Sequence, residues 1–191
     1  MYYHTQLSDT TVSYSGQCYE FDNFRSENDD VVGFDLEPGV TAIRIASFRA
    51  TRVSSLEALR GSEVAQIREH AFEDSDVESL EALPGCMSTV SHKAFAGCSS
   101  LQSLAGLPFP CRVSSTAFDS CFRLHQAAAF LGFTCVHEWV RARALRFAVL
   151  AAVRRCQDAP AGDGGCYAPL LAGITRLPED VVRAVLIPLL S

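Results

Sequence analysis

The chain has 191 residues, 48% of them hydrophobic, which is enough for one sizeable core or for a repeat array with a small appended unit. Its formal net charge is −6, so we do not expect a nucleic-acid-binding module, which needs a basic contact surface. The longest apolar run, residues 147–153, is too short to span a bilayer, and residues 1–11 lack the features of a signal peptide. We therefore expect a soluble intracellular protein, cytoplasmic or organellar, from which an organelle-targeting peptide could have been removed.

Charge is distributed unevenly along the chain. Residues 1–126 contain 17 acidic and 9 basic side chains, whereas residues 127–191 contain 5 and 7. Together with a repeated pattern in the first part, this shift predicts three segments. They are an N-terminal cap with a degenerate first coil (1–39), a repeat region (40–126) and a helical C-terminal cap or docking segment (127–191).

The repeated pattern consists of apolar residues at fixed positions. A phenylalanine recurs at intervals of 24, 24, 23 and 23 residues, at Phe24, Phe48, Phe72, Phe95 and Phe118. Five positions before each stands another apolar residue: Tyr19, Ile43, Ile67, Val90 and Val113. Aliphatic residues three positions apart follow in three repeats, as Val53, Leu56 and Leu59, then Val77, Leu80 and Leu83, then Leu101, Leu104 and Leu107. Repeats of this length predict stacking that buries each set as a column, with Glu73, Asp74 and Asp76 facing water.

Two of the repeats carry a family resemblance. The strings VSHKAFAGCSSLQSL (90–104) and VSSTAFDSCFRL (113–124) resemble the BspA-like leucine-rich repeats, in which Ala-Phe is followed by Cys and then Leu at three-residue steps. The matching residues are Ala94, Phe95, Cys98 and Leu101, then Ala117, Phe118, Cys121 and Leu124. The repeats around Phe48 and Phe72 lack the cysteine, and the segment around Phe24 matches only through Phe24 and Tyr19.

The resemblance covers roughly residues 40–126 and implies an α+β repeat fold that binds other macromolecules. The fold expected from it is a short leucine-rich-repeat solenoid of four to five coils with a C-terminal α-helical cap. Phe24 would then belong to a degenerate end coil.

The eight cysteines do not form zinc-binding pairs with histidine partners. Cys98 and Cys121 fall in one repeat position, so we expect neighbouring, reduced thiols packed in the core; a disulfide or a metal pair is the alternative. Glu27, Asp29 and Asp30 are interpreted as a solvated acidic turn, because they lack the ligand spacing of a calcium loop. With no catalytic constellation, we expect no catalytic, cofactor-binding or metal-binding residues, and no enzyme.

The C-terminal part favours helices. Residues 137–156 contain no Gly or Pro and predict a helix, and residues 157–165 predict a loop. A second helix is expected within residues 177–190, with Pro178 in its first turn and an end or a kink at Pro188. Its Leu-Pro start resembles the helix of F-box and SOCS-box segments, which attach substrate receptors to ubiquitin ligases. The alternative is a helix that closes the C-terminal cap.

The function predicted is a non-catalytic protein–protein interaction or scaffold module, such as a small subunit of a larger assembly. The alternative is a substrate receptor or adaptor of a ubiquitin ligase. The partner is expected to be another protein or a multi-subunit complex, with no nucleic acid, no transmembrane segment and no small-molecule ligand. The predicted partner-binding residues are Val182, Val185, Leu186 and Leu189, and the concave face between Leu56 and Leu107 is the candidate if the C-terminal helix is only a lid.

Overall fold

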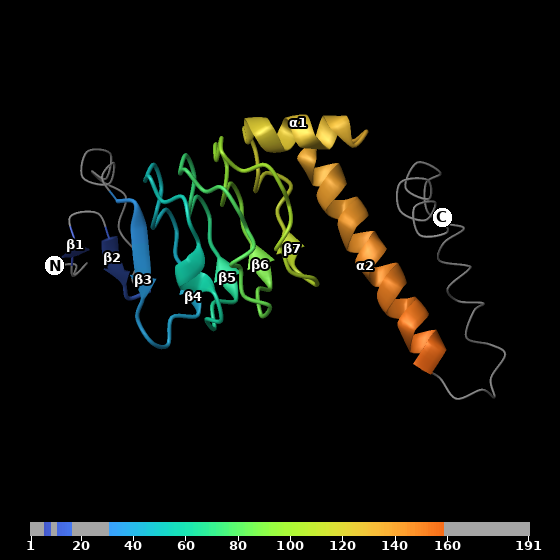
Figure 1. Cartoon of the computed structure of the whole chain (residues 1–191), viewed down its shortest axis with the longest axis horizontal. Coiled ribbons are helices and arrows are strands. Elements are labelled where there is room, and N and C mark those ends of the chain that lie inside the picture. The colour runs from blue at the N-terminus through green and yellow to red at the C-terminus, as the bar shows by residue number, and fades with distance from the viewer. Residues whose placement is uncertain (1–5, 9–10, 17–30, 159–191) are drawn as a thin grey trace. The chain divides into compact units, whose positions relative to one another are not determined.

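The computed structural model describes residues 6–8, 11–16 and 31–158 (Figure 1). The chain divides into two compact units, Met1–His137 and Glu138–Ser191. The strands are β1 (Gln6–Ser8), β2 (Thr11–Tyr14), β3 (Gly33–Leu36), β4 (Ala42–Ile43), β5 (Gln66–Ile67), β6 (Thr89–Val90) and β7 (Arg112–Val113). The helices are the 3-10 turn η1 (Glu57–Leu59), α1 (Phe122–Phe130) and α2 (Val136–Asp158).

The strands form two separate short sheets. In the first sheet β1 pairs antiparallel with β2, and β2 pairs in parallel with β3. In the second sheet β4 to β7 are all parallel and lie in chain order, as Figure 1 shows. The register aligns Ile43 with Ile67, then Val90, then Val113. The predicted column of apolar residues is therefore present, although Val113, at its end, is only half-buried.

A column of aromatic rings forms the centre of the first unit. Phe48, Phe72, Phe95 and Phe118 are all buried, and successive ring centroids lie 5.2, 5.3 and 5.7 Å apart with nearly parallel planes. The aliphatic columns are buried as well, at Val53, Leu56, Leu59, Val77, Leu80, Leu83, Leu101, Leu104 and Leu107. The predicted register and burial of the repeat are thus confirmed. We call residues 40–121 the repeat stack.

The N-terminal sheet covers the first repeat. Phe34 of β3 lies against Phe48, with ring centroids 4.3 Å apart, and Tyr14 of β2 lies 5.3 Å from the same ring. The Tyr14 hydroxyl hydrogen-bonds the Ser47 hydroxyl at 3.1 Å and accepts a bond from the backbone N–H of Arg44 at 2.8 Å. Tyr14 is fully buried, so its hydroxyl needs these hydrogen-bond partners. The predicted end coil at Tyr19 and Phe24 lies outside the described residues.

Turns surround each phenylalanine and connect neighbouring repeats. The backbone N–H groups of Phe48, Phe72 and Phe95 donate to the carbonyls of Ala71, Ala94 and Ala117 at 2.8–2.9 Å. Of the eight residues two positions before or after a phenylalanine, all but Thr116 take left-handed backbone angles: Ala46, Ala50, His70, Asp74, Lys93, Gly97 and Ser120. Most of them are not glycine, so the hydrogen bonds between repeats must offset about 1–2 kcal/mol of strain at each such residue.

The position three residues after each phenylalanine holds a buried polar column. Thr51 and Ser75 fill it in the first two repeats, and Cys98 and Cys121 fill it in the last two. The Thr51 and Ser75 hydroxyls donate to the phenylalanine carbonyl of their own repeat, at 2.9 and 2.7 Å. The two thiols reach the phenylalanine carbonyl of the preceding repeat, at 3.2 and 3.0 Å. Hydroxyl and thiol therefore both act here as small donors to a phenylalanine carbonyl, although to carbonyls of different repeats.

The predicted fold class is wrong. The described chain contains two short, mostly parallel sheets and two α-helices, not a leucine-rich-repeat solenoid of four to five coils with an α-helical C-terminal cap. The first sheet includes an antiparallel pair and does not continue the second, whose strands are only two residues long. The physical reason is that the repeat period specifies which side chains stack, but not the backbone conformation between them. Turns make up most of each repeat.

Both α-helices come after the repeat stack in the chain. The predicted helix over residues 137–156 is confirmed as α2, and α1 begins at Phe122, inside the segment assigned to the last repeat. The compact units divide after His137, whereas the charge distribution placed a boundary after Gln126. Within the described residues no helix combines the length and the apolar character needed to cross a membrane. The second predicted helix, beginning at Pro178, lies outside the described residues.

Candidate functional site

The outward face of the second sheet carries basic and neutral polar side chains. Because side chains alternate along a strand, the residues on either side of the buried Ile43, Ile67, Val90 and the half-buried Val113 point away from the core. We call these eight residues the sheet face: Ala42, Arg44, Gln66, Arg68, Thr89, Ser91, Arg112 and Ser114. It contains three exposed arginines and no carboxylate.

Carboxylates gather instead on the segment that follows Phe72. In the second repeat, residues 74–81 contain four exposed acidic residues and no basic one: Asp74, Asp76, Glu78 and Glu81. The expectation that Asp74 and Asp76 face water is confirmed. The sheet face is therefore free of carboxylates, although the part of the chain that contains it has an acidic overall balance.

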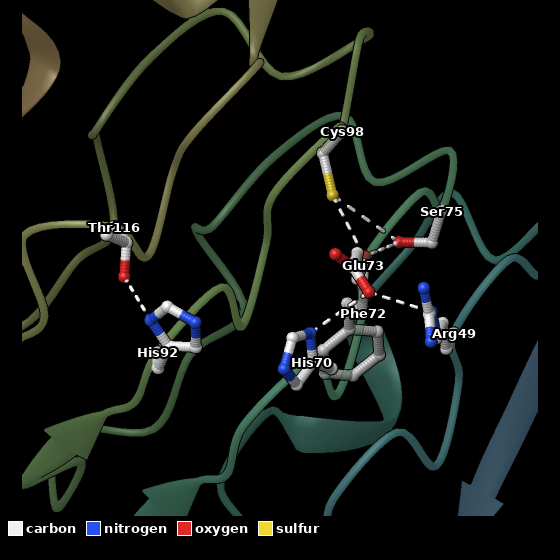
Figure 2. A network of polar contacts seen from close by, with 8 residues as sticks. All are labelled: Arg49, His70, Phe72, Glu73, Ser75, His92, Cys98 and Thr116. Carbon is white, nitrogen blue, oxygen red and sulfur yellow. Dashed lines mark hydrogen bonds and ion pairs between the residues drawn. The ribbon is translucent and has the colours of Figure 1, made fainter. Parts of the chain in front are cut away.

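Glu73 departs from the expectation that it faces water. Its side chain is only 11% exposed, and its Oε2 atom accepts from Arg49 Nε at 2.7 Å and lies 3.0 Å from His70 Nδ1 (Figure 2). The cause is that stacking places Arg49 directly beside Glu73, since both residues follow the phenylalanine of their repeats. An ion pair with a second hydrogen bond makes this burial of a carboxylate tolerable.

The polar contacts continue into the next repeats. The rings of His70 and His92 have centroids 5.4 Å apart and planes at 86° to each other, and His92 Nδ1 lies 2.6 Å from Thr116 Oγ1 (Figure 2). The Ser114 hydroxyl lies a further 3.1 Å from the same oxygen. Arg49, Glu73, His70, His92 and Thr116 thus form a polar strip that crosses every repeat from β4 to β7.

The sequence indicated none of this strip. His70 stands two positions and His92 three positions before the phenylalanine of its repeat, which argued against their being neighbours. They meet because the backbone N–H of His70 donates to the carbonyl of His92, which places the two residues side by side in adjacent turns. The i,i+3 spacing of His70 and Glu73 was the one feature of the sequence that could have indicated a contact, and this spacing is common on protein surfaces.

The buried thiols are unsuited to covalent chemistry. Cys98 and Cys121 are free, as the sequence predicted, and burial raises the pKa of Cys98 to about 11 and that of Cys121 to about 12. The thiolate is the reactive form, so these side chains stay protonated and inert near neutral pH. Figure 2 shows Cys98 directed at the Phe72 carbonyl, beside Ser75. Their role is in packing and hydrogen bonding.

The partner-binding residues predicted from the sequence cannot be placed on this surface. Val182, Val185, Leu186 and Leu189 all lie outside the described residues, as does the acidic run at Glu27, Asp29 and Asp30. Within the described part of the chain, no group of three or more His, Cys, Asp or Glu residues could hold a metal ion.

Comparison of the chain with protein-family models, with curated proteins and with solved structures gives no significant match to any of them.

Proposed function

We propose that this protein is a non-catalytic interaction module that binds another protein through the sheet face. The observation that carries the proposal is the difference between the inward-facing and the outward-facing columns of side chains in the repeat stack. The inward columns repeat one residue type, such as phenylalanine, whereas the residue type varies along both outward columns. One outward column is Arg44, Arg68, Ser91 and Ser114, and the other is Ala42, Gln66, Thr89 and Arg112. Stability explains the repeated core, but it does not require three arginines without a carboxylate on one face.

The chemistry of the sheet face favours an acidic partner segment. Arginine presents a rigid fork of donors that matches carboxylates, and its guanidinium is weakly hydrated, so it suits protein interfaces. Arg44 is already oriented, because its Nε donates to the Gly16 carbonyl at 3.0 Å. An oriented side chain loses less conformational freedom on binding than a mobile one. Hydroxyl and amide groups at Gln66, Thr89, Ser91 and Ser114 would add hydrogen bonds around the arginines.

The family resemblance favours the same class of function. Residues 90–104 and 113–124 resemble BspA-like repeats, whose usual role is to bind other macromolecules, and we keep this assignment as a proposal. The alternative function, a ubiquitin-ligase substrate receptor, depends on the Leu-Pro segment at 177–190. That segment lies outside the described residues, so the two functions are best separated by experiment.

The proposal is tested by affinity capture with charge-reversal variants of the full chain, followed by quantitative mass spectrometry. Arg68→Glu combined with Arg112→Glu reverses two charges on the sheet face. The matched control, Arg52→Glu with Arg60→Glu, makes the same net charge change at exposed positions away from that face. We expect the first double variant to lose a specific partner that the wild type and the control retain.

A chain ending at residue 176 completes the experiment. If this truncated protein loses the partner while the sheet-face variant retains it, the C-terminal segment binds and the sheet-face proposal is wrong. Capture of a Skp- or elongin-type adaptor that depends on residues 177–191 would support the ubiquitin-ligase function. Unchanged capture by all variants would contradict both surfaces.

A further inference from the structure

The imidazoles of His70 and His92 form a pair whose Nδ1 atoms are both occupied. His70 Nδ1 is held by the Glu73 carboxylate at 3.0 Å, and His92 Nδ1 is held by the Thr116 hydroxyl at 2.6 Å. Among the described residues neither Nε2 atom has a hydrogen-bond partner, and Figure 2 shows the Nε2 atoms on the sides of the rings that face each other. His92 is exposed and His70 partly so, which leaves the pair accessible.

The hydrogen bonds at Nδ1 are of the kind that metal-binding histidines make. A histidine that binds a metal through one ring nitrogen usually donates its other N–H to a carboxylate or another oxygen acceptor, which fixes the tautomer and the ring orientation. Glu73 supplies such a carboxylate to His70, and Thr116 supplies an oxygen to His92. Glu73 is itself held by Arg49 at 2.7 Å, so the carboxylate is fixed before any ion arrives.

The separation of the rings fits one ion between them. With Zn–N bonds of about 2.0–2.1 Å and tetrahedral angles, two imidazoles bound through Nε2 place their centroids about 5.2 Å apart. The observed distance is 5.4 Å. We propose that His70 and His92 bind one divalent transition-metal ion of the zinc class through their Nε2 atoms.

The described residues supply two ligands, and water completes the coordination. Imidazole ligands favour Zn²⁺, Ni²⁺, Cu²⁺ and related ions over Mg²⁺ or Ca²⁺, which prefer oxygen. A site with two protein ligands is weaker than a structural zinc site with four, so the affinity is expected to be modest. The site is independent of the sheet-face proposal, since ion binding requires no protein partner.

The test is titration of the full chain, purified without a polyhistidine tag, with Co²⁺ as a spectroscopic substitute for Zn²⁺. We expect saturable binding of one ion with half-saturation below about 1 mM, displaced by Zn²⁺. The Co²⁺ spectrum should lack the charge-transfer band of a thiolate ligand, because no cysteine takes part. A thiolate band would place the ion on exposed cysteines such as Cys86 or Cys135 and would overturn the assignment.

Variants identify the ligands. His92→Ala and His70→Asn should each abolish the saturable phase; asparagine is chosen because His70 has a φ of 58°, which asparagine tolerates. Glu73→Gln should weaken binding about 10- to 100-fold, as loss of an outer hydrogen bond to a ligand does. His125→Ala, at an exposed histidine away from the pair, should change nothing. Circular dichroism confirms that each variant is folded, and unchanged binding by the folded His92→Ala variant would overturn the proposal.

Discussion

Phe72 and Phe95 lie face to face, with ring centroids 5.3 Å apart and ring planes within 3° of parallel. The backbone N–H of Phe72 donates to the carbonyl of Ala94, the residue directly before Phe95, so the hydrogen bonds between repeats set the spacing of the rings. Both side chains are fully buried. One aromatic contact of this kind joins each repeat to the next, so a defect in the column affects two interfaces at once.

Replacing Phe95 with alanine should lower the free energy of unfolding by about 3–5 kcal/mol, because the change removes a buried ring and leaves a cavity between two others. Urea unfolding monitored by circular dichroism measures the effect. Phe130→Ala is the matched control, since that side chain is 92% exposed and its loss should have little effect. Equal effects of the two substitutions would contradict the buried column.

Three glycines with left-handed backbone angles should differ in their tolerance of alanine. A methyl group on Gly61 would meet open space, so the substitution should cost only the backbone strain, about 1–2 kcal/mol. A methyl group on Gly97 would meet the Asp74 carboxylate, and one on Gly106 would meet the backbone of Glu81. A side chain can move and a backbone cannot, so urea midpoints should fall in the order Gly61→Ala, Gly97→Ala, Gly106→Ala. A Gly106→Ala protein as stable as Gly61→Ala would refute the close approach.

Cysteine reactivity should follow burial. Cys86 and Cys135 are exposed and should be alkylated rapidly in the native protein, whereas Cys98 and Cys121 should react only on unfolding. Peptide mass spectrometry after timed alkylation gives the rates. Alkylation of the denatured, unreduced protein should label both buried residues. An intact crosslink between them would show that they are not free thiols.

The same thiols should make the protein less stable at alkaline pH. Their pKa values in the folded state, about 11 for Cys98 and about 12 for Cys121, lie above the ordinary value of 9.0. Above about pH 9 the unfolded chain therefore binds fewer protons at these groups than the folded one, so the free energy of unfolding falls as pH rises. Urea midpoints between about pH 8.5 and 10.5 should show this decrease.

A double variant, Cys98→Ser with Cys121→Ser, isolates the contribution of the thiols. Serine already occupies this column at Ser75 and does not ionise in this pH range, so the variant should fold and should lose less stability on alkalinisation. The same slope in both proteins would mean that other groups cause the alkaline dependence.

The order of the residues was sufficient to predict which side chains stack. An interval of 23 or 24 residues identified the phenylalanine column and the aliphatic columns, because such repeats form a core by burying like side chains against each other. Composition was likewise sufficient for α2, where residues 137–156 contain no Gly or Pro and the structure has a helix at Val136–Asp158.

The path of the backbone between the columns, and the contacts made on the surface, could not be predicted in this way. The antiparallel pairing of β1 with β2, the burial of Glu73 and the contact of His70 with His92 all depend on contacts between separate segments of the folded chain. The backbone hydrogen bond from His70 to His92 brings the two histidines together, although their repeat positions differ. The repeat period predicts which residues occupy equivalent positions along the stack. It does not predict where a polar side chain points, because that direction depends on the backbone angles and on the residues it contacts.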